Sequence, residues 1–299
     1  MTDPWVAEKE LTEALARRLI NEQFPELSAS NIEPIGAGWD NTAYRVDDTW
    51  LFRFPRRQVA VPAIETECAV LPRIASPLPL TVPNPQFVGQ PSDLFPWPFA
   101  GYRWIAGQTA CVANLSDEER SAAAPPLASF LRTLHALPVP AGAPADTLRR
   151  FDLELRNRYI EERLESAKKA GLVRADQPLL RILEDVPADW SPSETTLVHG
   201  DLYVRHIVVN VQREVSAIID WGDVHAGEPA GDLSIAWSFL GAARDRFREA
   251  YGDIDDESWH MARYRALLYG VTLAVFGDRT SDEALVREAQ RILRNVSEA

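Results

Sequence analysis

The sequence has few cysteines and no long apolar run, and these absences narrow the classes of protein it can be. Cys68 and Cys111 are the only cysteines in 299 residues. Their spacing fits neither a disulfide framework nor a zinc motif, which indicates a reducing compartment. No uninterrupted apolar run reaches the roughly 18 residues of a membrane span. The start, "MTDPWVAEKELTEALARRLI", is acidic and amphipathic and lacks the apolar core of a signal peptide. We therefore expect a cytoplasmic protein with no membrane partner.

Positive charge is also scarce. The chain has 31 Lys and Arg against 44 Asp and Glu, a formal net charge of −13. This argues against a nucleic-acid partner, because nucleic-acid-binding proteins usually carry a basic face. The excess of acid mainly favours solubility, and it would also suit a cationic small-molecule partner. Lysine occurs only at Lys9, Lys168 and Lys169, so arginine supplies nearly all of the positive charge.

The first hundred residues predict a small, mostly β lobe. Within "NIEPIGAGWDNTAYRVDDTWLFRFPRR" (31–57), alternation in "TAYRV" and "TWLFRF" indicates two strands joined by a turn at Asp47-Asp48. Helical spacing of apolar residues predicts a short helix over 62–75. A proline-rich segment, 76–98, precedes the strand-like "FAGYRWIAGQ". We expect residues 1–106 to form a nucleotide-binding lobe that begins with a helix and ends with this connecting strand.

The remaining residues, 107–299, predict a larger and mostly helical lobe that holds the acceptor site. Helical periodicity extends over 127–137 and 146–171, and the second segment ends in Lys-Lys-Ala-Gly, as a helix C-terminus often does. The strand-like "IVVNV" and "VSAIID" flank the short turn Gln212-Arg213-Glu214 and predict a hairpin. From about residue 231 to 297 the pattern predicts three helices. The expected fold class is therefore α+β with two lobes.

Acidic and histidine side chains gather at the two ends of the predicted hairpin. The stretch "LVHGDLYVRHIVVN" places His199, Asp201 and His206 just before it, and Asp220 ends its second strand. Because a hairpin brings its ends together, we expect the two carboxylates to lie near each other. Two carboxylates and a histidine suit a divalent cation. The order of residues also matches phosphoryl transfer, in which one aspartate accepts a hydroxyl proton and two later side chains hold magnesium.

The motifs "VHGDLYVRH" and "IIDWGDVHAGEPAGDLS" resemble the paired motifs of the aminoglycoside and macrolide phosphotransferases. These are small-molecule kinases with a protein-kinase-like fold, and the order of elements agrees from about residue 30 to the end. The resemblance implies that Asp201 is the catalytic base and that Asp220, of Asp220-Trp221-Gly222, is the metal-binding aspartate. It also implies that Asp232 braces the catalytic loop. We expect His199 to support the same loop through hydrogen bonds to backbone.

The chain departs from the usual pattern of that family at two positions. His206 stands where asparagine is usual; a neutral imidazole can bind a metal, although it is softer than the oxygens that Mg²⁺ prefers. The lysine usual on the inner strand of the small lobe is absent, which leaves Arg53 to contact the nucleotide phosphates. Glu67 would hold Arg53, with Glu65 as the alternative if the helix has another register. The phrases "DLYVRH" and "FRFPRR" resemble the macrolide 2'-phosphotransferase branch.

Further residues are expected at the nucleotide and acceptor sites. Gly36 and Gly38, between two strand-like segments, would let backbone N–H groups approach phosphates. Tyr102 and Trp104 of the connecting strand are also assigned to the nucleotide by the resemblance. The candidates for acceptor binding, which follow the metal-binding aspartate in the chain, are Asp223, His225 and Trp237.

The resemblance implies a nucleotide-dependent O-phosphotransferase. With Mg²⁺ and ATP or GTP, it would move the γ-phosphate to a hydroxyl of a small cationic molecule. The motifs favour a macrolide antibiotic as acceptor, and the wider family favours an aminoglycoside. Two alternatives stay open: a metabolite kinase of the same fold acting on choline, homoserine or a sugar amine, and a degenerate kinase that binds nucleotide without turnover. The sequence decides neither between ATP and GTP nor the oligomeric state.

Overall fold

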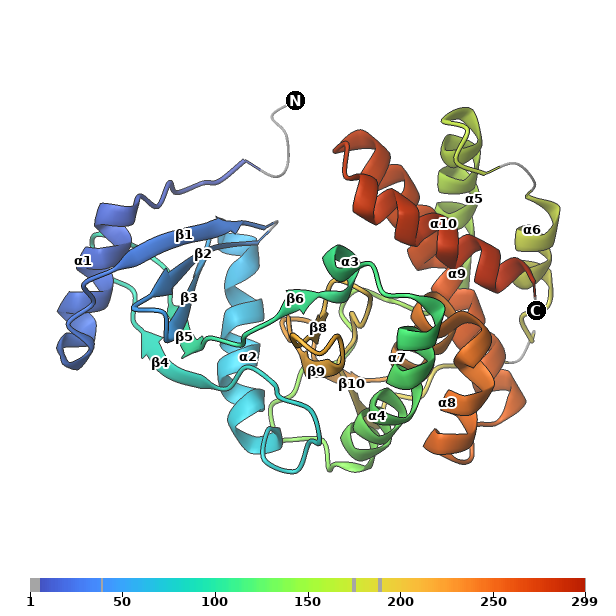
Figure 1. The fold of residues 1–299 in the computed structure, drawn as a ribbon, viewed down its shortest axis with the longest axis horizontal. Coiled ribbons are helices and arrows are strands. Elements are labelled where there is room, and N and C mark those ends of the chain that lie inside the picture. Colours follow the sequence, from blue (N-terminus) through green and yellow to red (C-terminus); the bar gives the residue numbers. More distant parts are fainter. Residues whose placement is uncertain (1–5, 39, 174–175, 188–189, 299) are drawn as a thin grey trace. The chain divides into compact units, whose positions relative to one another are not determined.

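The computed structural model describes residues 6–38, 40–173, 176–187 and 190–298. By contact the chain divides into two compact units (Figure 1). Unit 1 comprises 1–76, 82–106 and 220–223, and unit 2 comprises 77–81, 107–219 and 224–299. The sequence predicts a single boundary between residues 106 and 107. By contact, 77–81 belongs to unit 2 although it precedes this boundary, and 220–223 belongs to unit 1 although it follows it.

In its described residues, unit 1 is built on an antiparallel sheet of five strands in the order β1-β2-β3-β5-β4. A helix precedes the sheet in the chain, and another lies between its third and fourth strands. The elements are α1 (Glu13–Gln23), a 3₁₀ turn (Pro25–Leu27), β1 (Ile32–Ala37), β2 (Asn41–Val46), β3 (Trp50–Pro55), a 3₁₀ turn (Gln58–Ala60), α2 (Val61–Ile74), β4 (Pro85–Gly89) and β5 (Phe99–Arg103). α2 confirms the short helix that the sequence predicts over 62–75.

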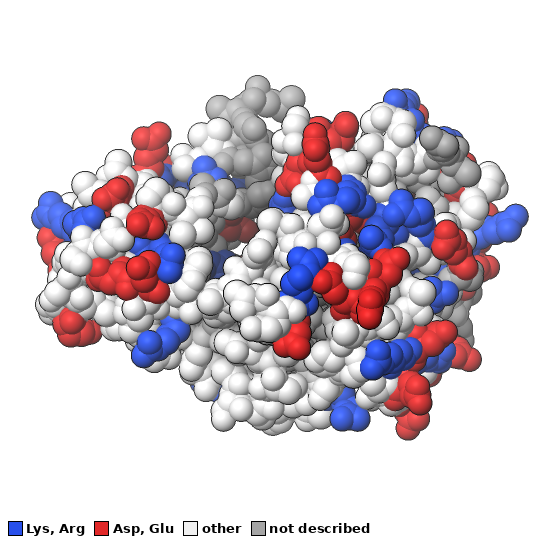
Figure 2. Space-filling view, viewed as in Figure 1, with Lys and Arg blue, Asp and Glu red and all other residues white. Residues whose placement is uncertain are grey.

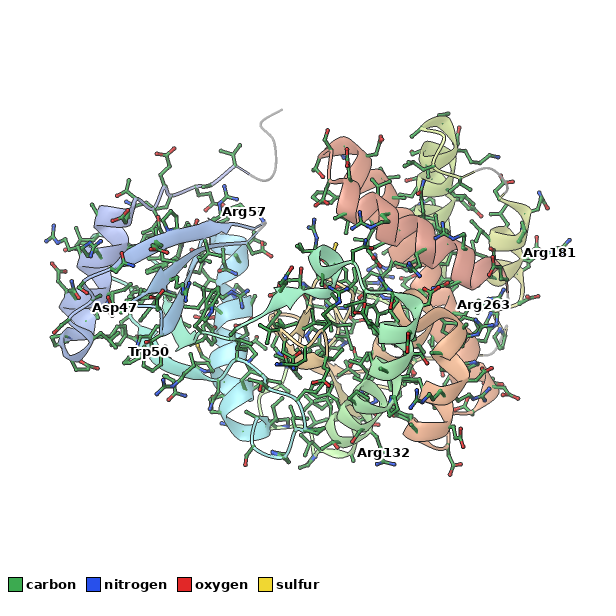
Figure 3. All side chains as sticks on the ribbon, viewed as in Figure 1. Asp47, Trp50, Arg57, Arg132, Arg181 and Arg263 are labelled. Atoms are coloured by element: carbon green, nitrogen blue, oxygen red, sulfur yellow. The ribbon has the colours of Figure 1, made fainter. Side chains whose placement is uncertain are left out.

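The hairpin of β2 and β3 follows the alternation of the sequence. Val46 lies opposite Trp50 in the register, and Asp47 and Asp48 take φ angles of 46° and 54° in the turn between them. Tight hairpin turns need this left-handed backbone, which aspartate adopts more readily than most residues. Trp50 packs edge-on against Phe87 of β4, with ring centroids 4.9 Å apart (Figure 3). The two predicted strands and their turn are confirmed.

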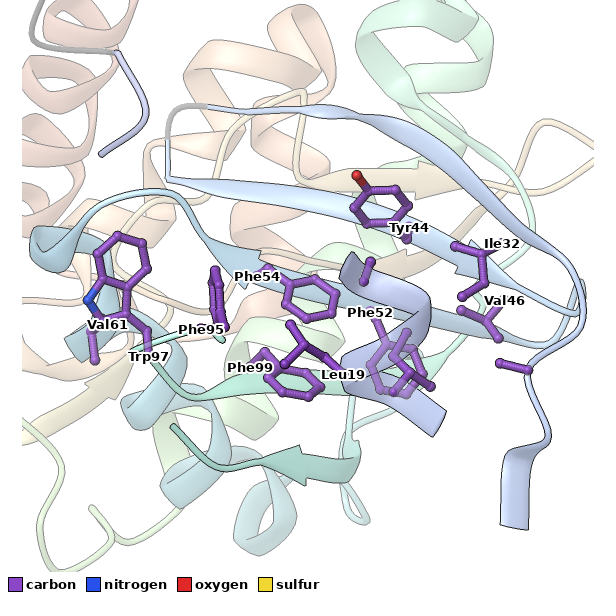
Figure 4. Close-up of a cluster of buried hydrophobic side chains, with 13 residues drawn as sticks. Leu19, Ile32, Tyr44, Val46, Phe52, Phe54, Val61, Phe95, Trp97 and Phe99 are labelled. Atoms are coloured by element: carbon purple, nitrogen blue, oxygen red, sulfur yellow. The ribbon is translucent and has the colours of Figure 1, made fainter. Parts of the chain in front are cut away.

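The core of unit 1 lies between α1 and one face of the sheet (Figure 4). Phe52 and Phe54 of β3, Phe99 of β5 and Leu19 of α1 are buried there. Burial of each such side chain stabilises the fold by about 1.5–3 kcal/mol. Because successive side chains of a strand point to opposite faces, Arg53 points away from this core. The alternation that buries Phe52 and Phe54 therefore places the guanidinium of Arg53 on the other face of the sheet.

Unit 2 carries most of the helices, with short strands among them. Its elements are β6 (Gln108–Thr109), α3 (Ala110–Ala113), α4 (Asp117–Ala136), α5 (Leu153–Lys169), α6 (Gln177–Glu184), β7 (Thr196–Val198), β8 (Ile207–Val209), β9 (Val215–Ile218), β10 (His225–Gly227), α7 (Ala230–Leu233), a π-helical turn (Ala236–Leu240), a 3₁₀ turn (Gly241–Ala243), α8 (Arg244–Tyr251), α9 (Asp256–Arg279) and α10 (Glu283–Ser297). β8 pairs with β9 and β6, and β7 pairs with β10. The β8–β9 hairpin confirms the prediction around Gln212-Arg213-Glu214.

Three helical predictions in unit 2 need correction. The helix expected over 127–137 is the second half of α4, which ends at Ala136 but begins at Asp117, because Ser116 and Glu119 form a capping box there. The helix expected over 146–171 begins only at Leu153, since Asp152 caps it. Of the three helices expected from about residue 231 to 297, α9 and α10 confirm the last two, whereas the first is broken into α7, the π-helical turn, the 3₁₀ turn and α8. One break falls at Gly241, whose φ of 58° few other residues adopt.

Candidate active site

Arg53 joins two carboxylates within unit 1. Its guanidinium donates to Glu67 Oε1 at 2.7 Å and Oε2 at 3.0 Å, and to Asp220 Oδ1 at 2.8 Å. The Glu67 side chain is 1% exposed, whereas that of Asp220 is 46% exposed. Glu65, the alternative partner, is exposed on another face of α2. Of the two glutamates, Glu67 is therefore the one that contacts Arg53, and the Arg53–Glu67 pair extends to Asp220.

This network keeps its arginine charged. Burial by itself would lower the pKa of Arg53, but the charges of Glu67 and Asp220 hold that pKa well above its ordinary value. Burial raises the pKa of Glu67, against the opposing effect of Arg53. Tyr102 of β5 donates to Glu67 Oε2 at 2.6 Å and is itself buried. Unit 1 therefore presents a fixed cation beside the half-exposed carboxylate of Asp220.

The Asp220-Trp221-Gly222 segment is shaped by close packing on α2. Asp220 takes a φ of 65°, in the left-handed region that favours glycine. Trp221 is fully buried. A Cβ added to Gly222 would lie 2.9 Å from Ala63 Cβ and 3.8 Å from Glu67 Oε1. Only glycine lets this segment pass so close to the helix that carries Glu67.

The loop between β1 and β2 contains the two glycines expected near phosphate. Gly36 has a φ of 150°, with open space where a Cβ would stand. The Gly38 N–H donates to the Asn41 carbonyl at 2.9 Å. This hydrogen bond within the hairpin uses the same N–H that is expected to contact phosphate, so the two contacts compete. Beside this loop, Arg57 pairs with Asp40 at 2.8 Å (Figure 3).

Tyr102 and Trp104, the other residues assigned to the nucleotide, have partners within unit 1. The hydroxyl of Tyr102 is used by Glu67. Trp104 donates its backbone N–H to Thr49 at 2.8 Å, and the guanidinium of Arg45 lies 4.8 Å from its ring centroid. Their contact with a nucleotide stays a prediction.

In unit 2, a single buried carboxylate holds the loop between β7 and β8. Asp232 of α7 accepts the backbone N–H of His199 at 2.7 Å and of Gly200 at 3.0 Å. His135 of α4 contacts the same carboxylate at 3.2 Å. Burial by itself would raise the pKa of Asp232, but the hydrogen bonds of His135 and His199 hold that pKa below its ordinary value. The loop that carries Asp201 is thus fixed by an ionised group.

His199 also links this loop to the end of β9. Its ring is fully buried, with Nε2 3.1 Å from the Ile219 carbonyl, while its Nδ1 accepts the Asp201 N–H at 3.3 Å. These contacts fit a neutral ring that carries its proton on Nε2. Arg150, which the sequence analysis missed, donates to the Gly200 carbonyl at 2.9 Å. No motif singled it out, because it precedes the loop by 50 residues.

Asp201 and His206 lie together in this loop. His206 Nδ1 is 2.7 Å from the Asp201 carbonyl and 3.8 Å from Asp201 Oδ2. Since a carbonyl oxygen can only accept, Nδ1 carries the proton and Nε2 carries the lone pair of the neutral ring. The hydroxyl of Tyr269, another residue that the sequence analysis missed, donates to Asp201 Oδ1 at 2.9 Å.

The side chains expected to bind Mg²⁺, those of Asp220 and His206, offer a carboxylate oxygen and an imidazole nitrogen. Among the described residues, no three His, Cys, Asp or Glu side chains form a group that could hold a metal by themselves. Magnesium at phosphate-transfer sites usually takes only one or two carboxylates, with phosphates and water completing its shell. Taken separately, the half-exposed carboxylate of Asp220 in unit 1 and the Nε2 of His206 in unit 2 are each of a ligand type that such a partial shell can use; that both bind one ion stays a prediction.

Two of the acceptor candidates lie in packed surroundings. His225 of β10 is 4% exposed, and a Cβ on Gly227 would lie 2.4 Å from its ring. Trp237 is 5% exposed and packs against Trp259, with centroids 5.3 Å apart; Arg263 also lies over its ring (Figure 3). These positions favour a packing role for both. Asp223, in unit 1, is half-buried.

Most of the chain matches a known protein family. Residues 31–267 match the family described as "Phosphotransferase enzyme family". The uncharacterized protein YcbJ of Bacillus subtilis (strain 168) is 24% identical over 92% of this chain and 94% of its own length. The solved GDP and kanamycin complex of APH(2")-IIia is 26% identical, with a TM-score of 0.69 over 95% of this chain and 98% of that one. A macrolide 2'-phosphotransferase type I is 22% identical, with a TM-score of 0.55 over 94% and 97%.

The match to the family extends over most of the chain, and the similar structures share its α+β, kinase-like fold. The fold class expected from the sequence is confirmed. The protein belongs to the phosphotransferase enzyme family.

Proposed function

We propose that the protein transfers the γ-phosphate of a nucleoside triphosphate to a hydroxyl group of a small, amine-bearing molecule. The observation that carries the proposal is the anchored loop of Asp201, in which the buried Asp232 accepts two consecutive backbone N–H groups. A loop fixed in this way limits the orientations of the Asp201 carboxylate. A general base needs such positioning to accept a proton efficiently.

In the proposed reaction, Asp201 accepts the proton of the acceptor hydroxyl. The hydroxyl oxygen bonds to the γ-phosphorus while the bond from that phosphorus to the bridging oxygen breaks. The nucleoside diphosphate leaves with the bonding electron pair. Arg53 would balance phosphate charge, held for that purpose by Glu67. A bound Mg²⁺ would neutralise further charge, and Asp220 and His206 are the residues proposed to hold it.

The proposed donor is ATP or GTP. One similar structure, 26% identical, is a complex with GDP, and a more distant one, 16% identical, contains ATP. Arg53 suits either nucleotide, because its planar group recognises phosphate oxygens rather than a base. Both donors therefore belong in the same assay.

The proposed acceptor is an aminoglycoside, with a macrolide as the second choice. The motif phrases favour a macrolide, but the chain is more similar to the kanamycin complex than to the macrolide enzyme. An acidic protein of net charge −13 also complements a substrate with several ammonium groups. Acidic and basic side chains are interspersed on the face that Figure 2 shows, so this charge forms no single patch there.

Release of nucleoside diphosphate tests the proposal. The full chain with Mg²⁺ and ATP or GTP is assayed against a kanamycin-type aminoglycoside, an erythromycin-type macrolide, choline and homoserine. We expect turnover with the aminoglycoside. Turnover of the macrolide alone contradicts the acceptor but not the reaction, and turnover of choline or homoserine alone supports the metabolite-kinase alternative. Nucleotide binding without turnover of any acceptor contradicts the proposed reaction.

A further inference from the structure

A buried tyrosine contacts the proposed base from a distant helix. The hydroxyl of Tyr269 in α9 lies 2.9 Å from Asp201 Oδ1. An ionised carboxylate only accepts hydrogen bonds, so the phenol is the donor. Tyr269 is 7% exposed. Burial and the charge of Asp201 raise the pKa of this phenol well above its ordinary value. Tyr269 therefore keeps its proton at neutral pH and remains a donor.

Two neighbouring side chains restrict the ring that carries this hydroxyl. Arg265, one turn earlier on α9, places its guanidinium carbon 4.8 Å from the ring centroid of Tyr269. Tyr203 of the catalytic loop stacks on Tyr269 at 5.7 Å with an interplanar angle of 17°. Arg265 is itself only 8% exposed. The hydroxyl thus has little freedom to move away from the carboxylate, because the ring is held on the helix side and on the loop side.

We propose that Tyr269 is a positioning residue that fixes the orientation of the Asp201 carboxylate for accepting the acceptor proton. Its hydrogen bond to Oδ1 restricts rotation of the carboxylate about its last torsion. The carboxylate is then held in one orientation toward the acceptor hydroxyl, and Tyr269 keeps its own proton throughout the transfer. The inference rests on the proposed function, because it assigns a task within the same reaction.

The test replaces the tyrosine by phenylalanine in the full chain. Tyr269→Phe removes one oxygen and keeps the ring contacts with Arg265 and Tyr203. We expect kcat to fall by about 10- to 100-fold, since a hydrogen bond to a charged group contributes roughly that factor. The KM values for nucleotide and acceptor should stay within about threefold of wild type, because Tyr269 is proposed to touch neither.

Tyr264→Phe is the matched control. Tyr264 lies on the same helix, is equally buried, and donates its hydroxyl to Asn157 Oδ1 at 2.7 Å. We expect this variant to keep its kcat within about twofold of wild type, since Asn157 has no part in the proposed reaction. A kcat for Tyr269→Phe within threefold of wild type, or an equal loss in Tyr264→Phe, overturns the proposal.

A thermal double-mutant cycle tests the hydrogen bond without any turnover. Tyr269→Phe should lower Tm by about 2–4 °C in the wild-type background. In an Asp201→Ala background the same change should cost clearly less, because only the hydrogen bond between the Tyr269 hydroxyl and Arg265 is then left to lose. Equal losses in both backgrounds overturn the inference. If the wild-type chain phosphorylates none of the acceptors, the proposed function fails, and this cycle alone decides whether Tyr269 holds Asp201.

Discussion

At the residue scale, Arg53 is an arginine where the sequence resemblance leads one to expect a lysine, and the two side chains differ in chemistry. The guanidinium has several N–H donors in a rigid plane, so a single side chain donates to Glu67 and to Asp220 together. A lysine ammonium is a compact charge on a flexible stem. The planar fork thus links α2 to the segment of Asp220 in a way that a lysine does not reproduce directly.

Arg53→Met tests this role. The change leaves the Glu67 carboxylate, 1% exposed, without its cation, and breaking a buried pair in this way costs about 3–5 kcal/mol. We expect a clear fall in Tm and at least about a tenfold loss of nucleotide affinity by calorimetry. Arg53→Lys is the matched control and should recover part of both. If Arg53→Met binds nucleotide as tightly as wild type, the phosphate role is wrong.

Asp232→Asn tests the brace of the catalytic loop through its pH dependence. The pKa of Asp232 in the folded chain lies below its ordinary value, despite the burial that raises it. Its ionised form therefore stabilises the fold above the ordinary carboxyl pKa of about 3.9, and that contribution is lost as pH falls through the folded-state pKa. Because an amide has one acceptor oxygen and one NH2 group, Asn would turn N–H groups toward the N–H donor of either His199 or Gly200.

We expect Asp232→Asn to lower stability by about 1.5–3 kcal/mol near pH 7, with a Tm difference from wild type that shrinks below about pH 4. Asp117→Asn is the control, because its side chain is 87% exposed and surface pairs contribute at most about 1 kcal/mol. A Tm difference that stays constant from pH 7 to pH 3 contradicts the brace as described.

At the element scale, the course of α4 depends on contacts that its own sequence does not show. Pro125 and Pro126 predict a helix that starts after them, because proline lacks the N–H that bonds to the carbonyl four residues earlier. In the structure Arg246 of α8 donates to the Ser121 carbonyl at 3.2 Å, which is the carbonyl that residue 125 would otherwise satisfy. The local capping box of Ser116 and Glu119 sets the start of the helix, and a partner 125 residues away, which no local pattern records, satisfies the carbonyl that Pro125 leaves open.

Gly222→Ala tests the close passage of the Asp220 segment past α2. The new Cβ would meet Ala63 Cβ at 2.9 Å, and neither atom belongs to a flexible side chain. Overpacking of this kind costs about 1–3 kcal/mol. We expect Tm to fall and nucleotide affinity to drop at least about threefold. A displacement of α2 at Ala63 would also move Glu67, which lies on the same helix, and so disturb its contact with Arg53 of β3. Calorimetric titration with GDP and ADP measures the affinity.

Gly231→Ala is the control for this substitution. Its Cβ would meet Phe151 at 3.6 Å, an ordinary contact, and it lies within α7. Alanine favours a helix over glycine, so Tm should be unchanged or slightly higher. An unchanged Tm and nucleotide affinity for Gly222→Ala would show that the segment does not need glycine.

At the scale of the whole molecule, the sequence predicts those elements and site residues that follow from local periodicity or from paired motifs. Alternation along β2 and β3 places Arg53 opposite the aromatic core, and helical spacing on α2 places Glu67 on a buried face. Motif spacing singles out Asp201 and Asp232. The sequence could not predict Tyr269, which lies 68 residues after Asp201 on a helix whose pattern reads as core. Contacts of this kind arise from tertiary packing, which no local periodicity records.

Charge and family membership are properties of the whole chain that bear on the proposed reaction. No helix in the described part of the chain is long and apolar enough to cross a membrane. The chain belongs to a phosphotransferase family, and its net charge of −13 is compatible with the small cationic acceptor proposed above. The central claim is that Asp201 accepts the proton of that acceptor during phosphoryl transfer.

Transfer of labelled γ-phosphate to a kanamycin-type acceptor, compared between the wild-type chain and Asp201→Asn, tests this claim most directly. The amide keeps the shape of the side chain and can still accept from Tyr269, but it cannot serve as a base. The account predicts that kcat falls at least about 100-fold, since a general base contributes roughly 10²–10⁴. Nucleotide affinity should stay within about threefold of wild type. An Asp201→Asn variant that keeps more than about a tenth of wild-type kcat would contradict the account.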